Sequence, residues 1–238
     1  MHYRCRAAGD NLARGMALVV ICALLCACAV NPPFEIADHC ATTTTVVTVS
    51  VPFFPQTEHQ CGPAALAGVL GAAGVAIAPE VLTPQVYLPG RQGSLQIELL
   101  AATRRGGRIA YRLAEEPQAL IAELEAGRPV LVLQNLLTPH VPVWHYAVLT
   151  GFDARSNRFF LNSGTKQQLP INAGKFLRSW DWTERWAMVA LRPGEIPARA
   201  DPHRYAEAVT AFEIVASSEA TRTAWQAAAE RWPQEPLA

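Results

Sequence analysis

The order in which helical and β-rich stretches follow one another constrains this chain of 238 residues more than any other feature. Helical patterns come first, each with a helix-favouring start or a terminating glycine, over residues 61–74, 94–106 and 116–127. β-rich stretches follow over residues 128–136, 145–153, 158–164 and 185–191, and DARSN predicts a hairpin turn between two of them. Helices followed by strands predict an α+β domain over residues 51–195.

Residues 1–27 have the pattern of a targeting segment. Three arginines precede the apolar run MALVVICALLCAC, which is too short to span a bilayer comfortably. The run ends in LCAC, which resembles the lipobox of bacterial lipoproteins. This resemblance implies cleavage before Cys28 and a diacylglyceryl group on Cys28. A plain secretory signal and an uncleaved N-terminal anchor are the alternatives.

Residues 28–50 are predicted to form a tether, because two prolines and a Thr-rich stretch show no helical period. A tether of this length would let a folded domain stand clear of a membrane. The residue after Cys28 is Ala29 rather than Asp, which in lipoproteins of Gram-negative cells implies sorting to the outer membrane. We therefore expect the domain at the periplasmic face of the outer membrane.

The charges of the chain give no sign of a nucleic-acid partner. Lys and Arg together number 20, and so do Asp and Glu. Beyond the signal segment the chain has no paired histidines on a helix and no CxxC. We therefore expect no metal site and no other cofactor.

Cys61 begins the first predicted helix, within PQTEHQCGPAAL. Unpaired N–H groups and the dipole at a helix start favour a thiolate and lower the pKa of a thiol, and a thiolate attacks carbonyl carbon. The polar residues before Cys61 fit the wall of a cleft better than a core. The alternatives are a buried, inert cysteine and a disulfide with Cys40 in an oxidising compartment.

A thiol nucleophile needs a base, and His145 is the strongest candidate. It begins the apolar strand HYAVLTG, where a rigid element can aim its ring. The other histidines beyond the signal segment are less suited, because they lie in the tether, the tail or a proline-flanked loop, or too near Cys61 along the chain. They are His39, His203, His140 and His59.

The base in turn needs a residue that orients it. Asn162 is predicted for this role, since it ends the next strand and the hairpin folds that end back toward His145. The uncertain register leaves Ser163 and Gln167 as alternatives. Asp153 is badly placed, because it lies ~26 Å along the same strand.

Gln56 is predicted to help hold the oxyanion that forms during attack. Its side-chain amide N–H would act together with the backbone N–H of Cys61, and Gln60 is the rival for this role. The Gly-rich stretch YLPGRQGSLQ, residues 87–96, is either an ordinary loop or part of a substrate groove.

PQTEHQCGPAAL, WHYAVLTGFD and FFLNSG together resemble the double-glycine-leader peptidases, a bacteriocin-processing branch of the papain-like cysteine peptidases. The resemblance covers roughly residues 51–192. It implies a papain-like fold, with N-terminal helices packed on an antiparallel sheet, and cleavage of peptide bonds without a cofactor. It also implies that Cys61 is the nucleophile, His145 the general base, Asn162 the third member and Gln56 the oxyanion donor.

Three features depart from that family's pattern. The usual third member is Asp followed by Pro, whereas here Asn162 is followed by Ser163. Gln56 lies one residue closer to Cys61 than in the family's commonest form. The best-known members are fused to a transporter with a nucleotide-binding domain, and this chain has no Walker motif. Cleavage of a leader during export is therefore not implied.

Residues 202–238 form an Ala-rich tail after the linker RPGEIPARADP. HRYAEAVTAFEIVA and SEATRTAWQAAAERWP predict two amphipathic helices that resemble part of a tetratricopeptide repeat array. Such a tail could recruit a protein partner. The alternative is a helical pair that packs on the main domain.

Together these features predict a lipid-anchored cysteine peptidase of the bacterial cell envelope, acting on a peptide or protein substrate. Two other functions fit the same features. One is a catalytically inactive binding or scaffold lipoprotein on the same fold, and the other is a thiol amidase or acyltransferase.

Overall fold

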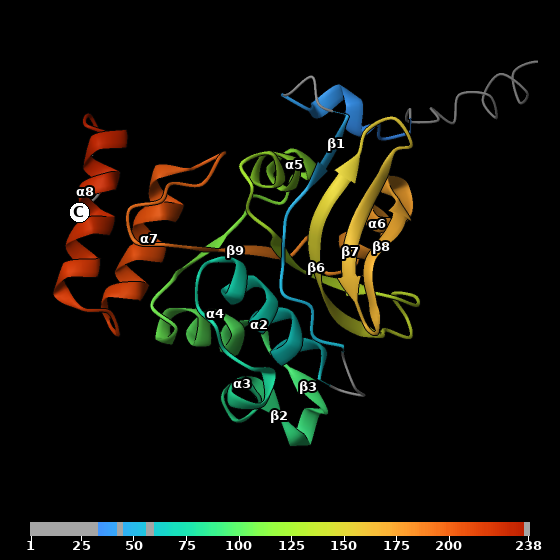
Figure 1. The fold of residues 1–238 in the computed structure, drawn as a ribbon, viewed down its shortest axis with the longest axis horizontal. Helices are drawn as coiled ribbons and strands as arrows, with labels where there is room; N and C mark the ends of the chain where they lie inside the picture. The colour runs from blue at the N-terminus through green and yellow to red at the C-terminus, as the bar shows by residue number, and fades with distance from the viewer. Residues whose placement is uncertain (1–32, 42–44, 56–59, 236–238) are drawn as a thin grey trace, which may run out of the picture. The chain divides into compact units, whose positions relative to one another are not determined.

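A seven-stranded antiparallel sheet runs through the computed structural model of the protein, which describes residues 33–41, 45–55 and 60–235 (Figure 1). The strand order is β4-β9-β5-β6-β7-β8, and β1 pairs with β6 beyond the end of β5. These strands are β1 (Val46–Thr48), β4 (Ile109–Arg112), β5 (Val130–Asn135), β6 (Trp144–Asp153), β7 (Arg158–Ser163), β8 (Lys166–Asn172) and β9 (Ala187–Leu191). Strands β2 (Tyr87–Leu88) and β3 (Gly93–Ser94) form a separate hairpin.

Helices cover both faces of the sheet. α2 (Cys61–Ala72) packs against β6, and its small Ala and Gly residues, nearly all buried, allow a close approach. α6 (Ala173–Asp181) covers the other face, where the rings of Phe176 and Phe159 lie 5.0 Å apart. The remaining helices before the tail are η1 (Ile36–His39), α3 (Pro79–Val86), η2 (Pro89–Arg91), α4 (Gln96–Arg105) and α5 (Pro117–Glu125). No helix within the described residues combines the length and the apolar character needed to cross a bilayer.

The pairing register sorts the residues of β6 and β7 onto two faces. Val148 lies directly opposite Asn162, so both side chains face α2, together with Tyr146. His145 directly precedes Tyr146, and Ser163 directly follows Asn162. Because side chains alternate along a strand, His145 and Ser163 therefore share the opposite face. This division decides which side chains can reach His145.

The predicted tether of residues 28–50 is wrong for two of its described parts, η1 and β1, because both are folded onto the domain. Ile36 in η1 is fully buried, and β1 pairs with residues 151–153 of β6. Gly151 permits this pairing, since a Cβ there would collide with the carbonyl oxygen of Val47. Val and Thr are typical strand residues, which explains why Val46–Thr48 joins the sheet. Residues 1–32, with the predicted signal and Cys28, lie outside the described residues.

The tail consists of α7 (Pro202–Glu213) and α8 (Ser218–Arg231). α7 packs on β4, where the rings of Tyr205 and Tyr111 lie 6.4 Å apart. α8 packs on α7 and buries Ala224 and Ala228 completely. The tail is thus a helical pair packed on the main domain, which is the second of the two arrangements considered from the sequence.

Candidate active site

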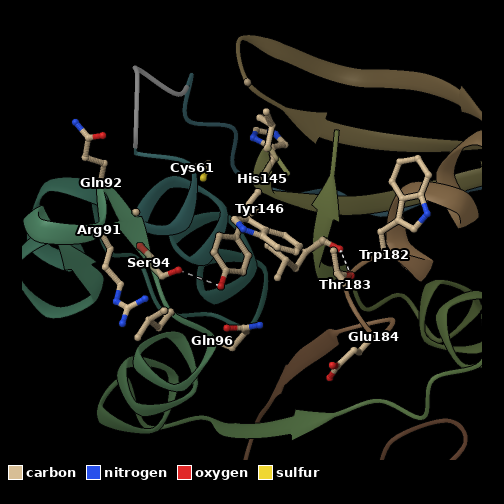
Figure 2. Close-up of a pocket in the computed structure, with 16 residues that line it drawn as sticks. Cys61, Arg91, Gln92, Ser94, Gln96, His145, Tyr146, Trp182, Thr183 and Glu184 are labelled. Carbon is tan, nitrogen blue, oxygen red and sulfur yellow. Dashed lines mark hydrogen bonds between the residues drawn. The ribbon is translucent and has the colours of Figure 1, made fainter. Parts of the chain in front are cut away.

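A cleft of about 970 Å³ opens at the end of the sheet where α2 and β6 begin (Figure 2). Its walls come from α2, the β2–β3 hairpin, the start of β6, and the segment between α6 and β9. Cys61 and His145 both line this cleft, although they are far apart in the sequence. The fold therefore brings together the two residues that the sequence analysis assigned as nucleophile and base.

Cys61 is the first residue of α2, and its sulfur lies near the backbone N–H groups of Tyr146, Gly62 and Cys61 itself. Burial raises the pKa of the Cys61 thiol, and these N–H groups lower it without offsetting the burial. The prediction that the helix start lowers the pKa of this thiol is therefore wrong in its net direction. Desolvation of the charged form outweighs the favourable N–H groups.

His145 is the second residue of β6, and its ring Nε2 lies 2.9 Å from the hydroxyl Oγ of Ser163 on β7. Burial lowers the pKa of the His145 imidazole. The backbone N–H of the next residue, Tyr146, lies near the sulfur of Cys61. One strand thus carries the candidate base and also contacts the candidate nucleophile.

The hydrogen bond predicted from Asn162 to His145 is made by Ser163, one of the two alternatives that the sequence left open. Asn162 faces α2, and its Oδ1 accepts the backbone N–H of Gln168 at 3.0 Å. Its Nδ2 is buried without a hydrogen-bond partner among the described residues. Gln167, the other alternative, is exposed on β8. The alternation of side chains along β7 explains why neighbouring residues differ so completely.

Gln56 lies outside the described residues, so its place relative to the cleft is not described. Its rival Gln60 is the N-cap residue of α2 and makes no side-chain capping bond. Cys40 and Cys61 are both free thiols, so the disulfide of the binding-module alternative is not formed. Within the described part of the chain, no group of three or more His, Cys, Asp or Glu could hold a metal ion.

Two residues of the cleft were not singled out from the sequence. Ser94 lies against Gly62, the residue after the nucleophile, where any Cβ would collide with the Ser94 side chain. Tyr146 donates its phenolic hydrogen to the backbone oxygen of Ser94 at 3.3 Å, and burial raises its pKa. The glycine after Cys61 was the available signal, because it shows that another segment approaches closely there. Residues 87–96, considered as a possible groove wall, do line the cleft from Arg91 to Gln96.

The opposite wall of the cleft is the segment between α6 and β9. Thr183 anchors it, with its buried hydroxyl oxygen 2.9 Å from the backbone oxygen of Leu133. Glu184 and Arg185 follow with φ values of 53° and 51°, a left-handed backbone that is uncommon for residues with side chains. Trp182 and Glu184 therefore project from a turn that is held firmly at its buried end.

Comparison with solved structures finds similar chains, among them these three. A C39-like peptidase from Bacillus anthracis is 17% identical, with a TM-score of 0.52 over 63% of this chain and 98% of the other. A double glycine motif protease from an AMS/PCAT transporter, solved with a leader peptide, is 24% identical, with a TM-score of 0.48 over 60% and 93%. The peptidase domain of Streptococcus ComA, a bifunctional ABC transporter, is 18% identical, with a TM-score of 0.46 over 61% and 97%. The first of these confirms the predicted α+β, papain-like fold.

No curated protein matches the chain. A sequence profile of a protein family does match it and assigns the chain to that family. The profile described as Peptidase C39-like family matches residues 48–188, which is more than half of the chain and includes Cys61, His145 and Ser163. The chain belongs to the Peptidase C39-like family, and its enzyme class is that of the cysteine-type peptidases.

Proposed function

We propose that the protein cleaves peptide bonds with Cys61 as nucleophile and His145 as general base. The observation that carries this proposal is that both side chains line one cleft in a member of a cysteine-peptidase family. The sulfur attacks the scissile carbonyl carbon while its proton passes to the imidazole, and the imidazolium then protonates the leaving amine. Water hydrolyses the resulting thioester and frees Cys61.

Backbone N–H groups at the start of α2 would stabilise the oxyanion of the tetrahedral intermediate, since they already lie near the sulfur of Cys61. Gln56 stays a prediction as the second donor. Of the predicted Cys-His-Asn mechanism we retain the first two members, because the hydrogen bond expected from Asn162 comes from Ser163.

The test is cleavage of a diverse peptide library by the purified full chain, compared with its Cys61→Ala variant. We expect cleavage by the wild type and none by the variant, with Cys40→Ala as the matched control that keeps full activity. Cleavage that survives Cys61→Ala would contradict the proposal. Release of ammonia without chain cleavage would favour the amidase, and retained peptide binding without turnover would favour the binding module.

We further propose that the enzyme is anchored to the periplasmic face of the outer membrane through a lipid on Cys28. The LCAC run and Ala29 support this address. Ile36, near the start of the folded part, donates its backbone N–H to Asn157 in the turn beyond the end of β6 that lies ~26 Å from His145. Incorporation of labelled palmitate into the wild type, and its loss in Cys28→Ser, would test the anchor.

The tetratricopeptide-like character of the tail and its protein partner also stay proposals. The turn between α7 and α8 exposes Ile214 and Val215, with 80% and 52% of their surface accessible. We expect a photo-crosslinker at position 214 to capture a partner at the cell envelope. The same crosslinker at the exposed, polar position 226 on α8 is the control, and equal capture at both would contradict a specific contact.

A further inference from the structure

The imidazole of His145 makes one hydrogen bond among the described residues, and its partner is a hydroxyl rather than a carboxylate. Nε2 lies 2.9 Å from Ser163 Oγ. Both side chains lie on the same face of the β6–β7 pair, so the contact follows from the strand pairing itself. Since Nε2 is engaged by Ser163, Nδ1 is the ring nitrogen left to take the proton of Cys61.

A hydroxyl partner differs from a carboxylate in two ways. A carboxylate only accepts, so it requires hydrogen on Nε2 and leaves Nδ1 ready to accept a proton. A hydroxyl both donates and accepts, so it permits either tautomer. A carboxylate also brings a negative charge that stabilises the imidazolium, whereas a hydroxyl brings none. Ser163 can therefore orient the ring without favouring its charged form.

Among the described residues, the other titratable groups around the cleft do not supply the missing charge. They are Arg91 of η2, Tyr146 of β6, Glu184 beyond α6, and Lys166 of β8, which pairs with Ser163 across the β7–β8 hairpin. Burial is the one cause that lowers the pKa of His145, and no neighbouring charge contributes to that shift. Burial likewise is the largest cause that raises the pKa of Cys61.

We propose that Ser163 is the positioning residue of His145 and that Cys61 and His145, both partly buried beside this uncharged partner, rest as a neutral thiol and a neutral imidazole. The inference rests on the proposed function only in treating the two as the catalytic pair. The thiolate then forms during attack itself. As the sulfur–carbon bond forms, the S–H bond breaks, the proton moves to Nδ1, and the carbonyl π electrons move onto oxygen.

The charge state is tested by the rate at which iodoacetamide alkylates Cys61 in the full chain, from about pH 5 to pH 10, followed by mass spectrometry of the peptide that carries Cys61. A neutral resting pair predicts a single rise with a midpoint above the ordinary thiol value of about 8.5, and slow labelling at pH 6. A plateau of fast labelling below pH 7 would overturn the proposal. The wild type alone decides this point, so it does not depend on the folding of any variant.

Ser163→Asp tests whether the missing charge is the cause. A carboxylate at this position should stabilise the imidazolium and increase labelling at pH 6 by at least ~10-fold. Cys40 in the same molecule is the internal control, because its labelling should not respond. If a folded Ser163→Asp chain, checked by circular dichroism, labels as slowly as the wild type, the neutral partner is not the cause and the proposal fails.

The positioning role has its own readout in peptide turnover. Ser163→Ala should lower kcat by at least ~10-fold with KM unchanged, and Ser163→Thr, which keeps the hydroxyl, should restore kcat. Equal kcat in all three proteins would overturn the positioning role. Alkylation does not require a substrate. An absence of any peptide cleavage would therefore count against the proposed function, while the pH profile would still decide the charge state.

Discussion

At the cleft end of the β6–β7 pair the two faces have separate tasks, although the residues on them alternate along the same strands. The face turned to α2 carries Tyr146, Val148 and Asn162, which are all buried, and the last two lie against that helix. The other face carries His145 and Ser163, which meet at the cleft through one hydrogen bond. One strand pair can thus build the core and orient a catalytic group, because its side chains point alternately to opposite sides.

The largest expected effect is on turnover, and it distinguishes the two faces most clearly. His145→Ala should reduce turnover by about 10⁴-fold, because no base remains to take the thiol proton, and should change the free energy of unfolding by less than ~1 kcal/mol. Val148→Ala on the other face should cost about 2 kcal/mol of stability and leave turnover per folded molecule intact. Chemical denaturation and peptide hydrolysis measure the two effects. Loss of turnover by Val148→Ala under folding conditions would break the comparison.

Gly62→Ala tests the contact between α2 and Ser94, where the core meets the wall of the cleft. The added Cβ would collide with the side chain of Ser94, so the cleft wall must move beside the nucleophile. Overpacking of this kind costs about 1–3 kcal/mol, and we expect turnover to fall as well. Gly62→Ala combined with Ser94→Gly should recover part of both losses. A double variant no better than the single one would show that Ser94 is not what constrains this position.

Asn162→Ala and Ser163→Ala are neighbouring substitutions with opposite expectations. Asn162→Ala removes the acceptor for the Gln168 N–H and should cost about 1–2 kcal/mol of stability with turnover within twofold of the wild type. Ser163→Ala should leave stability within about 0.5 kcal/mol and lower turnover. Thermal unfolding and kinetics on the same two samples give the comparison directly. If Asn162→Ala proved the more damaging to kcat at temperatures where it is folded, the assignment of the two faces would be wrong.

The smallest effect concerns pH. The pKa of His145 in the folded state lies below its ordinary value. As the pH falls, the unfolded chain therefore binds a proton on this residue before the folded chain does. Its contribution to stability is therefore present above about pH 6.5 and is lost as the pH falls below that value, by at most about 1.4 kcal/mol per pH unit. His145→Asn should flatten this part of the stability profile. An unchanged slope would place the responsible group elsewhere.

Much of the fold follows from local sequence patterns. The predicted helices correspond to α2, α4 and α5, and the predicted strands to β5, β6, β7 and β9. The second predicted helix, over residues 94–106, begins too early, because Ser94 belongs to β3 and α4 begins at Gln96. The strands of the main sheet that were not predicted are short or lie at its edges: β1, β4 and β8. Short edge strands gain their stability from pairing with a neighbour, which a local pattern does not contain.

The sequence by itself determined the nucleophile and base candidates, because a cysteine at a helix start and a histidine at a strand start are local patterns. It also determined the order of helices and strands, through periodicity and terminating residues. Only the tertiary structure decided that Ser163 rather than Asn162 meets His145, since one residue of register moves a side chain to the other face. It also decided that the thiol of Cys61 has a raised pKa, because desolvation depends on what packs around the sulfur and not on its neighbours in the chain.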